Sequence, residues 1–162
     1  MQFKAPWCRL LIGVSIFASA ICLGASLAAW FAMTRVGGDP SKWWAALLPA
    51  LMIVGAALFT IRGYSLERDS ILVHRLLWAT RLPRIGLKSA THDPAQIAGG
   101  IRIFGNGGFF SFSGWFRNKH LGTYRAYITD PSLAVVLRYG DRTVVLSPED
   151  PQRFVATVMG GR

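Results

Sequence analysis

The chain has 162 residues, of which 52% are hydrophobic and 16% charged, and its formal net charge is +10. This length accommodates one ordinary domain with additional segments, and the uneven placement of the apolar residues argues against a plain soluble domain. The two cysteines, Cys8 and Cys22, provide no disulfide framework and no cysteine-based metal site, which fits a reducing compartment.

Two long uncharged segments lie in the N-terminal part of the chain. Residues 10–33 include 24 consecutive positions without a charge, and residues 43–61 include 19. As helices these segments would be roughly 36 Å and 28 Å long, and a hydrocarbon core about 30 Å thick requires about 20 apolar residues. The sequence therefore predicts a transmembrane hairpin of two helices, at about 10–33 and 43–61.

Two other interpretations of the first segment are open. A buried core helix would show a polar stripe, and this segment has none. A cleaved signal peptide could use Lys4 and Arg9 as its charged region and Ala18-Ser19-Ala20 as its cleavage site. The apolar stretch continues to Met33, however, well beyond the roughly 7–15 residues of a signal h-region. We therefore favour an uncleaved anchor.

The basic residues indicate an orientation for the hairpin. The connection between the helices contains Arg35 and Lys42 around the turn Gly37-Gly38-Asp39-Pro40. The other side has five basic residues close to the helices: Lys4, Arg9, Arg62, Arg68 and Arg75. Because cytoplasmic segments carry the excess of Lys and Arg, we expect both termini in the cytoplasm.

The composition changes sharply at Arg62, so we divide the chain into a hairpin segment, 1–62, and a domain, 63–162. The segment from Arg62 onward carries 14 Lys/Arg and 7 Asp/Glu, a net charge of +7. The expected fold class is α+β, mainly β. The expected strands are 64–67, 71–75, 78–82, 87–90, 101–104, 123–129, 134–139 and 142–146. The last two flank Gly140-Asp141, which is typical of a hairpin turn.

One helix is predicted at the C-terminus. Ser147 can cap its N-terminus, Pro148 suits the first helical position, and the following acids favour the positive end of the helix dipole. Phe154, Val155 and Val158 then form an apolar stripe, and Gly160-Gly161 ends the helix.

Sequential strands closed by one C-terminal helix resemble a pleckstrin-homology-like (PH) domain, in particular the bacterial PH families that are often attached to transmembrane helices. The residues that carry this resemblance are Gly63–Glu67 with Ile71–Val73, Thr80–Pro83, Phe104–Gly108 through Gly114–Phe116, and Arg142–Asp150. The resemblance implies a partly closed antiparallel β-barrel with the helix plugging one end, and a bacterial origin. Together with the predicted hairpin, it leads us to expect a multi-pass protein of the cell inner membrane.

The resemblance implies no catalytic signature. Eukaryotic relatives bind phosphoinositides through basic residues in an early hairpin loop, but here that turn, Glu67–Ser70, is mixed in charge, so we do not transfer the site. His74, His92 and His120 lack metal-ligand spacing, and nucleophile, phosphate-loop and dinucleotide motifs are missing from the sequence. We predict no catalytic residue, no metal and no cofactor.

The segment from Phe109 to Lys119 is the candidate binding region. Aromatic residues interleave there with serine and glycine and are followed by basic residues. The candidates are Phe109, Phe110, Phe112, Trp115, Phe116, Arg117 and Lys119. Their alternation fits strands of the barrel core. Alternatively, the segment contacts the bilayer, where aromatics partition to the interface and Arg and Lys attract anionic headgroups.

The leading functional hypothesis is a membrane-anchored, non-catalytic module that presents a basic β domain to the cytoplasm. Its partners would be another protein or the lipid headgroups of the inner leaflet. The alternative is a subunit of a membrane enzyme or transport complex. Nucleic-acid binding ranks below both, because the basic residues are scattered rather than arranged in a stripe.

Overall fold

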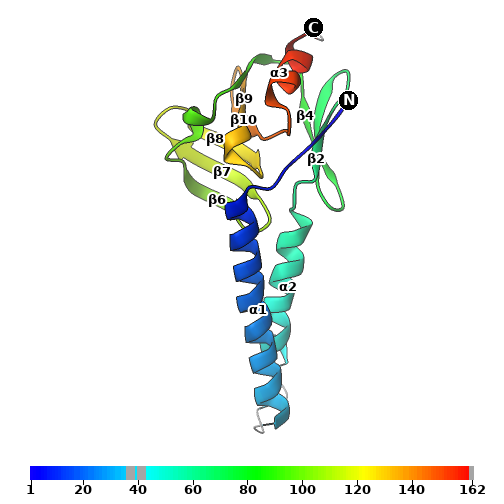
Figure 1. Ribbon diagram of the computed structural model, residues 1–162, viewed down its shortest axis with the longest axis vertical. Coiled ribbons are helices and arrows are strands. Elements are labelled where there is room, and N and C mark those ends of the chain that lie inside the picture. Colours follow the sequence, from blue (N-terminus) through cyan, green and yellow to red (C-terminus); the bar gives the residue numbers. More distant parts are fainter. Residues whose placement is uncertain (36–38, 40–42, 161–162) are drawn as a thin grey trace.

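The computed structural model describes residues 1–35, 39 and 43–160. A hairpin of two helices, α1 (Arg9–Arg35) and α2 (Trp44–Leu58), projects from one end of a β domain (Figure 1). The domain contains ten strands and the C-terminal helix α3 (Pro151–Gly160) within the described residues. The strands are β1 (Gln2–Lys4), β2 (Gly63–Leu66), β3 (Ser70–His74), β4 (Ala79–Pro83), β5 (Leu87–His92), β6 (Ile101–Gly107), β7 (Phe112–Asn118), β8 (Gly122–Ile128), β9 (Val135–Tyr139) and β10 (Thr143–Leu146). Two short 3-10 helices, η2 (Pro94–Ile97) and η3 (Pro131–Leu133), connect strands.

One described helix, α1, is long and apolar enough to cross a membrane; the sequence predicts two. Helix α1 has 27 residues, whereas α2 has 15, which is roughly 22 Å. Helix α2 is shorter than predicted because the apolar run 43–61 lies in two environments. Its first part forms the helix, and its end lies in the β domain. Ile61 is fully buried in the core of the β domain rather than on the hairpin. Pro49 lies inside α2 without ending it.

The first sheet has the strand order β1-β2-β3-β4, with every pair antiparallel. Its edge strand β1 precedes the hairpin in the chain and pairs with β2, which follows it, with Phe3 opposite Tyr64. The sequence pattern does not indicate this strand, because three residues before a helix carry no distinct strand signal. Strands β1 and β2 approach so closely that a Cβ at Gly63 would lie 2.6 Å from the Phe3 carbonyl oxygen. A residue without a side chain is therefore needed at position 63.

The second sheet has the order β5-β9-β10-β8-β7-β6. All its pairs are antiparallel except β8 with β10, which run parallel. The expected partly closed antiparallel barrel is therefore corrected to two separate sheets, of which this one is mixed and not closed. The physical reason is the position of β10, which lies between β9 and β8. These two neighbours run in opposite directions, so β10, which returns antiparallel to β9 in the hairpin, is parallel to β8. The hairpin itself confirms the prediction around Gly140-Asp141.

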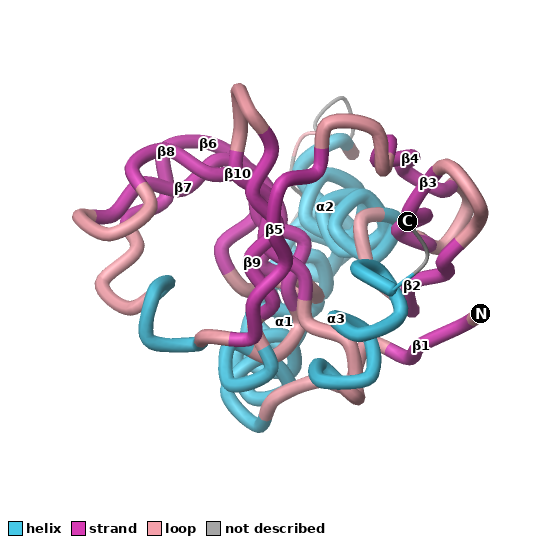
Figure 2. Tube along the Cα trace, turned by 90° about the horizontal axis from the view of Figure 1, so that it is seen from above, coloured by secondary structure: helices cyan, strands magenta, loops and turns pink. Residues whose placement is uncertain are grey.

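The expected C-terminal helix is present and lies between the two sheets when the domain is seen from above (Figure 2). Phe154 is fully buried, with its ring centroid 5.2 Å from that of Phe3 and 6.4 Å from that of Tyr64. The helix begins at Pro151, three residues later than predicted. Asp150 is the residue that caps it, because its carboxylate Oδ1 accepts from the Arg153 N–H at 3.0 Å.

Candidate functional site

The turn between β6 and β7 binds the base of the helical hairpin. The Phe110 N–H donates to Ser15 Oγ of α1 at 2.9 Å, and Ser111 Oγ donates to the Phe59 carbonyl at 3.2 Å. The Phe110 ring also lies 6.0 Å from that of Trp7, just before α1. This contact accounts for the burial of Ser15, which with Leu11 is one of two buried residues on α1. Phe110 thus contacts the hairpin base, and the Phe109 ring packs against that of Phe110 with a centroid separation of 4.8 Å. This placement is distinct from both interpretations based on sequence.

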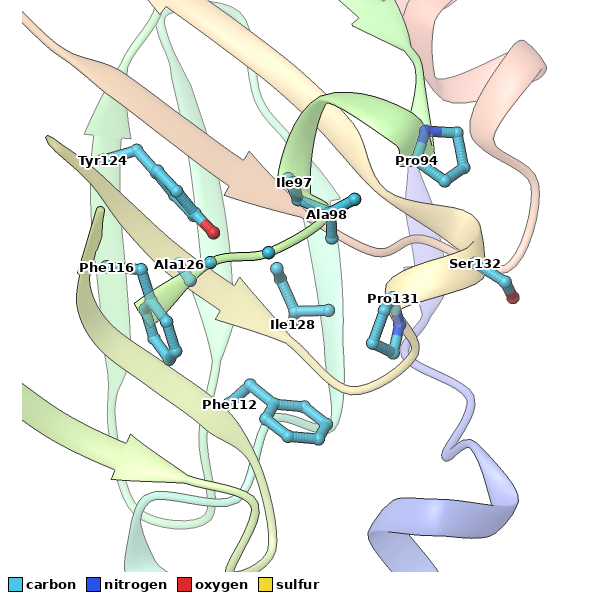
Figure 3. A pocket seen from close by; sticks show the side chains of 12 residues that line it. Pro94, Ile97, Ala98, Phe112, Phe116, Tyr124, Ala126, Ile128, Pro131 and Ser132 are labelled. Atoms are coloured by element: carbon cyan, nitrogen blue, oxygen red, sulfur yellow. The ribbon is translucent and has the colours of Figure 1, made fainter. Parts of the chain in front are cut away.

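The alternation of β7 sends its aromatic side chains to opposite faces of the sheet. Phe112 and Phe116 line an apolar pocket of about 480 Å³ under η2 and η3, where Phe116 stacks on Tyr124 with a centroid separation of 6.0 Å. Figure 3 shows Ile97 and Pro131 lining this pocket with the two phenylalanines. Trp115 lies on the other face and is exposed.

The structure divides the seven candidate residues among separate places. Arg117 and Lys119 are exposed at the end of β7 that is remote from the β6–β7 turn. A strand of seven residues extends about 23 Å, so these cations do not gather around Phe109 and Phe110.

A second pocket, here named the arginine pocket, lies between α2 and the face of β6–β8 that carries Trp115. Its volume is about 660 Å³. Met52, Gly55 and Ala56 of α2, with Phe59 directly after it, form one wall. The opposite wall comes from β6, β7, β8 and the β6–β7 turn, and consists of Phe104, Gly105, Asn106, Phe109, Ser113, Gly114, Trp115 and Tyr127. Three cations line it, Arg75, Arg102 and Arg125, and none of its described lining residues is acidic.

Aromatic rings hold two of these guanidinium groups in place. The Arg75 Cζ lies 5.3 Å from the Phe59 ring centroid and 5.4 Å from that of Tyr127, while Arg75 Nη1 donates to the Phe59 carbonyl at 2.9 Å. The Arg125 Cζ lies 5.7 Å from the Trp115 centroid and 5.3 Å from that of Tyr127. Both cations therefore interact with the same phenol ring.

Charge and burial perturb both Arg75 and Tyr127. Burial lowers the pKa of the Arg75 guanidinium; Tyr127 acts in the opposite direction, and the Arg125 cation lowers this pKa further. Burial raises the pKa of the Tyr127 phenol, and Arg125 and Arg75 oppose that shift. Among the described residues, the buried Tyr127 hydroxyl makes no hydrogen bond of good geometry, and the Arg125 side chain approaches it closely enough to lower its pKa.

Two elements that contribute residues to the arginine pocket also carry exposed apolar side chains. The β3–β4 turn exposes Leu76, Leu77 and Trp78, and the Trp78 ring contacts that of Phe59 at 5.3 Å. The edge strand β6 exposes Ile101, Ile103 and Phe104. The end of the domain at the hairpin thus combines apolar and cationic groups, the composition that suits a lipid–water interface.

Sequence reasoning did not select Arg75, Arg102, Arg125 or Tyr127. One signal was present, because Arg125 and Tyr127 alternate along β8 with Tyr124 and Ala126, which places the first pair on one face. The assembly with α2 and Arg75 could not be read from the sequence, since it depends on how the hairpin meets the sheets.

A family model described as "Bacterial PH domain" matches residues 62–161. The chain belongs to this family. The matched region begins where α2 has ended and includes both sheets except β1, together with α3, so the resemblance identified from sequence is confirmed. No curated protein and no solved structure matches the chain.

Proposed function

We propose that this bacterial PH domain protein is a membrane-anchored, non-catalytic interaction module whose helical hairpin lies in the bacterial inner membrane. Large apolar side chains are exposed along both helices: Leu10, Ile12, Val14, Ile16, Phe17, Ile21, Leu23, Leu27 and Phe31 on α1, and Leu47, Leu48, Leu51, Met52 and Val54 on α2. An apolar surface of this extent would be unstable in water and is suited to acyl chains.

The observation that carries the proposal is the pairing of β1 with β2. These strands lie on either side of the hairpin in the chain and form one sheet, so both belong to one folded domain. If α1 crosses the membrane, the chain must return before β2, and α2 is the only described helix between them. The pairing therefore supports two crossings, although α2 is shorter than a usual span.

The dimensions of the hairpin agree with this arrangement. Beyond Ser15, α1 continues for 20 residues, roughly 30 Å, which matches the hydrocarbon thickness. The shorter α2 can be accommodated by local thinning of the bilayer at a modest cost. Trp30, Trp43 and Trp44 are exposed toward the tip of the hairpin, where interfacial aromatics are expected.

The orientation that we propose places the domain and both termini in the cytoplasm. In the sequence, the basic residues that flank the hairpin on the domain side outnumber those between its two helices by five to two. The domain would then contact the inner leaflet, and its free surface would be available to a protein partner.

Membrane fractionation tests the anchor. We expect the full-length protein to resist extraction with alkaline carbonate. Ile21→Arg should reduce the inserted fraction, because an arginine at the centre of a span costs about 2.5–3.5 kcal/mol. Ile85→Arg is the matched control, since Ile85 is 82% exposed in the β4–β5 turn, against 56% for Ile21. A wild-type protein that carbonate releases would contradict the proposal.

A further inference from the structure

We infer that the arginine pocket binds one anionic glycerophospholipid, with its phosphate among Arg75, Arg102 and Arg125 and its acyl chains against α2. The inference rests on the proposed function, because the lipid reaches this pocket only if the hairpin is in the membrane. It specifies the site on the domain, the ligand class and the residues that recognise it.

The first argument is uncompensated charge. Among the described residues, the one ion pair joins Arg81 to Glu67 at 3.2 Å, outside this pocket. The three guanidinium groups thus face a shared cavity with no carboxylate in its described lining. Arg75 and Arg125 lie on the same Tyr127 ring and repel one another. A bound anion would attract both cations and so replace this repulsion with a net attraction. Planar guanidinium groups match phosphate oxygens in geometry as well as charge.

The second argument is independent of net charge and concerns polar atoms without partners. Arg75 Nε and the Tyr127 hydroxyl are both buried, and neither makes a hydrogen bond of good geometry with the described residues, although the Arg125 side chain approaches the Tyr127 hydroxyl and lowers its pKa. Tyr127 is 99% buried, as its exposed fraction is 1%. Buried polar groups are nearly always hydrogen-bonded, so a ligand with acceptor oxygens would satisfy both donors.

The third argument is the apolar wall. Gly55 and Ala56 leave space on the α2 side, and a Cβ added at Gly55 would meet no atom within 4 Å. Met52 and Phe104 are exposed at the same pocket. A cationic wall that continues into an apolar groove along a membrane helix fits an amphiphile, whose headgroup and acyl chains would occupy both parts. A free anion would occupy the cationic part alone.

The position differs from a binding site in the early hairpin loop. The β2–β3 turn lies next to the N-terminus, because the Leu66 N–H donates to the Met1 carbonyl at 2.8 Å. The N-terminus is at the end of the domain remote from the hairpin tip, whereas the arginine pocket adjoins α2 (Figure 1).

Lipid titration of the delipidated full-length protein in non-ionic detergent, read by native mass spectrometry, tests the inference. The probes are phosphatidylglycerol, phosphatidylcholine, glycerol 3-phosphate and inorganic phosphate at equal ionic strength. We expect Arg102→Gln with Arg125→Gln to weaken phosphatidylglycerol binding at least about tenfold, as each cation near anionic lipid contributes about fivefold. Arg68→Gln with Arg117→Gln makes the same charge change at exposed positions outside the pocket and should have little effect.

Gly55→Leu provides a second variant that changes no charge. It should weaken phosphatidylglycerol binding by filling the groove while leaving any glycerol 3-phosphate binding unchanged. Equal phosphatidylglycerol affinity in the wild type and the Arg102/Arg125 variant would overturn the inference. The inference would also be overturned if inorganic phosphate bound as tightly as phosphatidylglycerol, or if the Arg68/Arg117 control lost as much phosphatidylglycerol affinity as the Arg102/Arg125 variant. A wild-type protein that carbonate extracts would instead refute the anchor, which separates the two failures.

Discussion

The buried phenol of Tyr64 links the two sheets at the centre of the domain. Its hydroxyl donates to the Tyr127 carbonyl at 2.7 Å and accepts from the Ser147 N–H at 3.2 Å. Burial raises the pKa of Tyr64 to about 12, against an ordinary value of 10.0, and the hydrogen bonds with Ser147 oppose this shift. The neutral phenol is therefore a requirement of the folded state.

We predict a loss of stability at alkaline pH that depends on this residue. Below about pH 10 the contribution of Tyr64 is fully present, since the phenol is neutral in both the folded and unfolded states. Between pH 10 and pH 12 the unfolded chain releases the proton while the folded state retains it, so roughly 3 kcal/mol is lost. Denaturant unfolding across this pH range should show a smaller decline for Tyr64→Phe than for the wild type. Parallel declines would contradict the assignment.

Ser147 is not the N-cap of α3 that the sequence predicts, because Asp150 occupies that position. Ser147 is fully buried, and its Oγ accepts from the N–H groups of Thr129 and Asp130 at 2.9 and 3.3 Å. The capping motif identifies a helix start in this stretch, but it cannot select between two capping residues three positions apart. That selection depends on β8 supplying donors to Ser147, which is a tertiary effect.

Alanine substitutions separate the two roles. Ser147→Ala should cost about 1–3 kcal/mol, because it leaves buried N–H donors without an acceptor. Asp150→Ala should cost about 1 kcal/mol, the usual value of an N-cap. In hydrogen exchange, the first variant should deprotect the Thr129 amide and the second the first turn of α3. Faster exchange of α3 alone in Ser147→Ala would show that the serine is the cap after all.

At the scale of elements, β6 and β7 lie close together where Gly105 faces Gly114. Both have positive φ, 116° and 143°, and a Cβ on Gly114 would collide with the Phe104 carbonyl oxygen. Gly105 and Gly108 both have positive φ, a conformation that glycine adopts readily. Gly105 lies within strand β6, whereas Gly108 lies in the β6–β7 turn. This close pairing positions the turn that contacts α1 and α2.

Gly114→Ala should therefore destabilise the β6–β7 hairpin by about 1–3 kcal/mol from backbone strain, in addition to the cost of the steric clash. Thermal unfolding in detergent measures the loss. Gly122→Ala is an informative comparison, since Gly122 also has positive φ but a Cβ there would meet no atom within 4 Å. If both variants lost the same stability, strain alone would account for the effect and the close strand approach would not matter.

Local patterns predicted most of the individual elements of this molecule. Apolar periodicity and turn residues located the strands β2, β3, β4 and β9, the β9–β10 hairpin and the C-terminal helix. Long-range pairing was not accessible to the same reasoning. Strand β1 is too short to carry a signal, and the parallel pairing of β10 with β8 follows from chain routing rather than composition. The end of α2 depended on Ile61 entering the domain core.

At the scale of the whole molecule, the hairpin and the domain are joined at several points. Strand β1 enters the first sheet, the β6–β7 turn binds Ser15, and Arg75 of the β3–β4 turn donates to the carbonyl of Phe59, directly after α2. The candidate residues that lie close together in the sequence are dispersed in the structure. The arginine pocket, in contrast, assembles residues from segments that are distant in the sequence. Function in this family member is inferred from that junction.

The most direct test of the account is the accessibility of single cysteines on either side of the membrane. In a background with Cys8→Ser and Cys22→Ser, Asp39→Cys reports on the tip of the hairpin and Lys119→Cys on the domain. A membrane-impermeant thiol reagent should label Lys119→Cys in inside-out inner-membrane vesicles and Asp39→Cys in intact spheroplasts. Labelling of both positions from the same side would contradict a hairpin that crosses the membrane and returns.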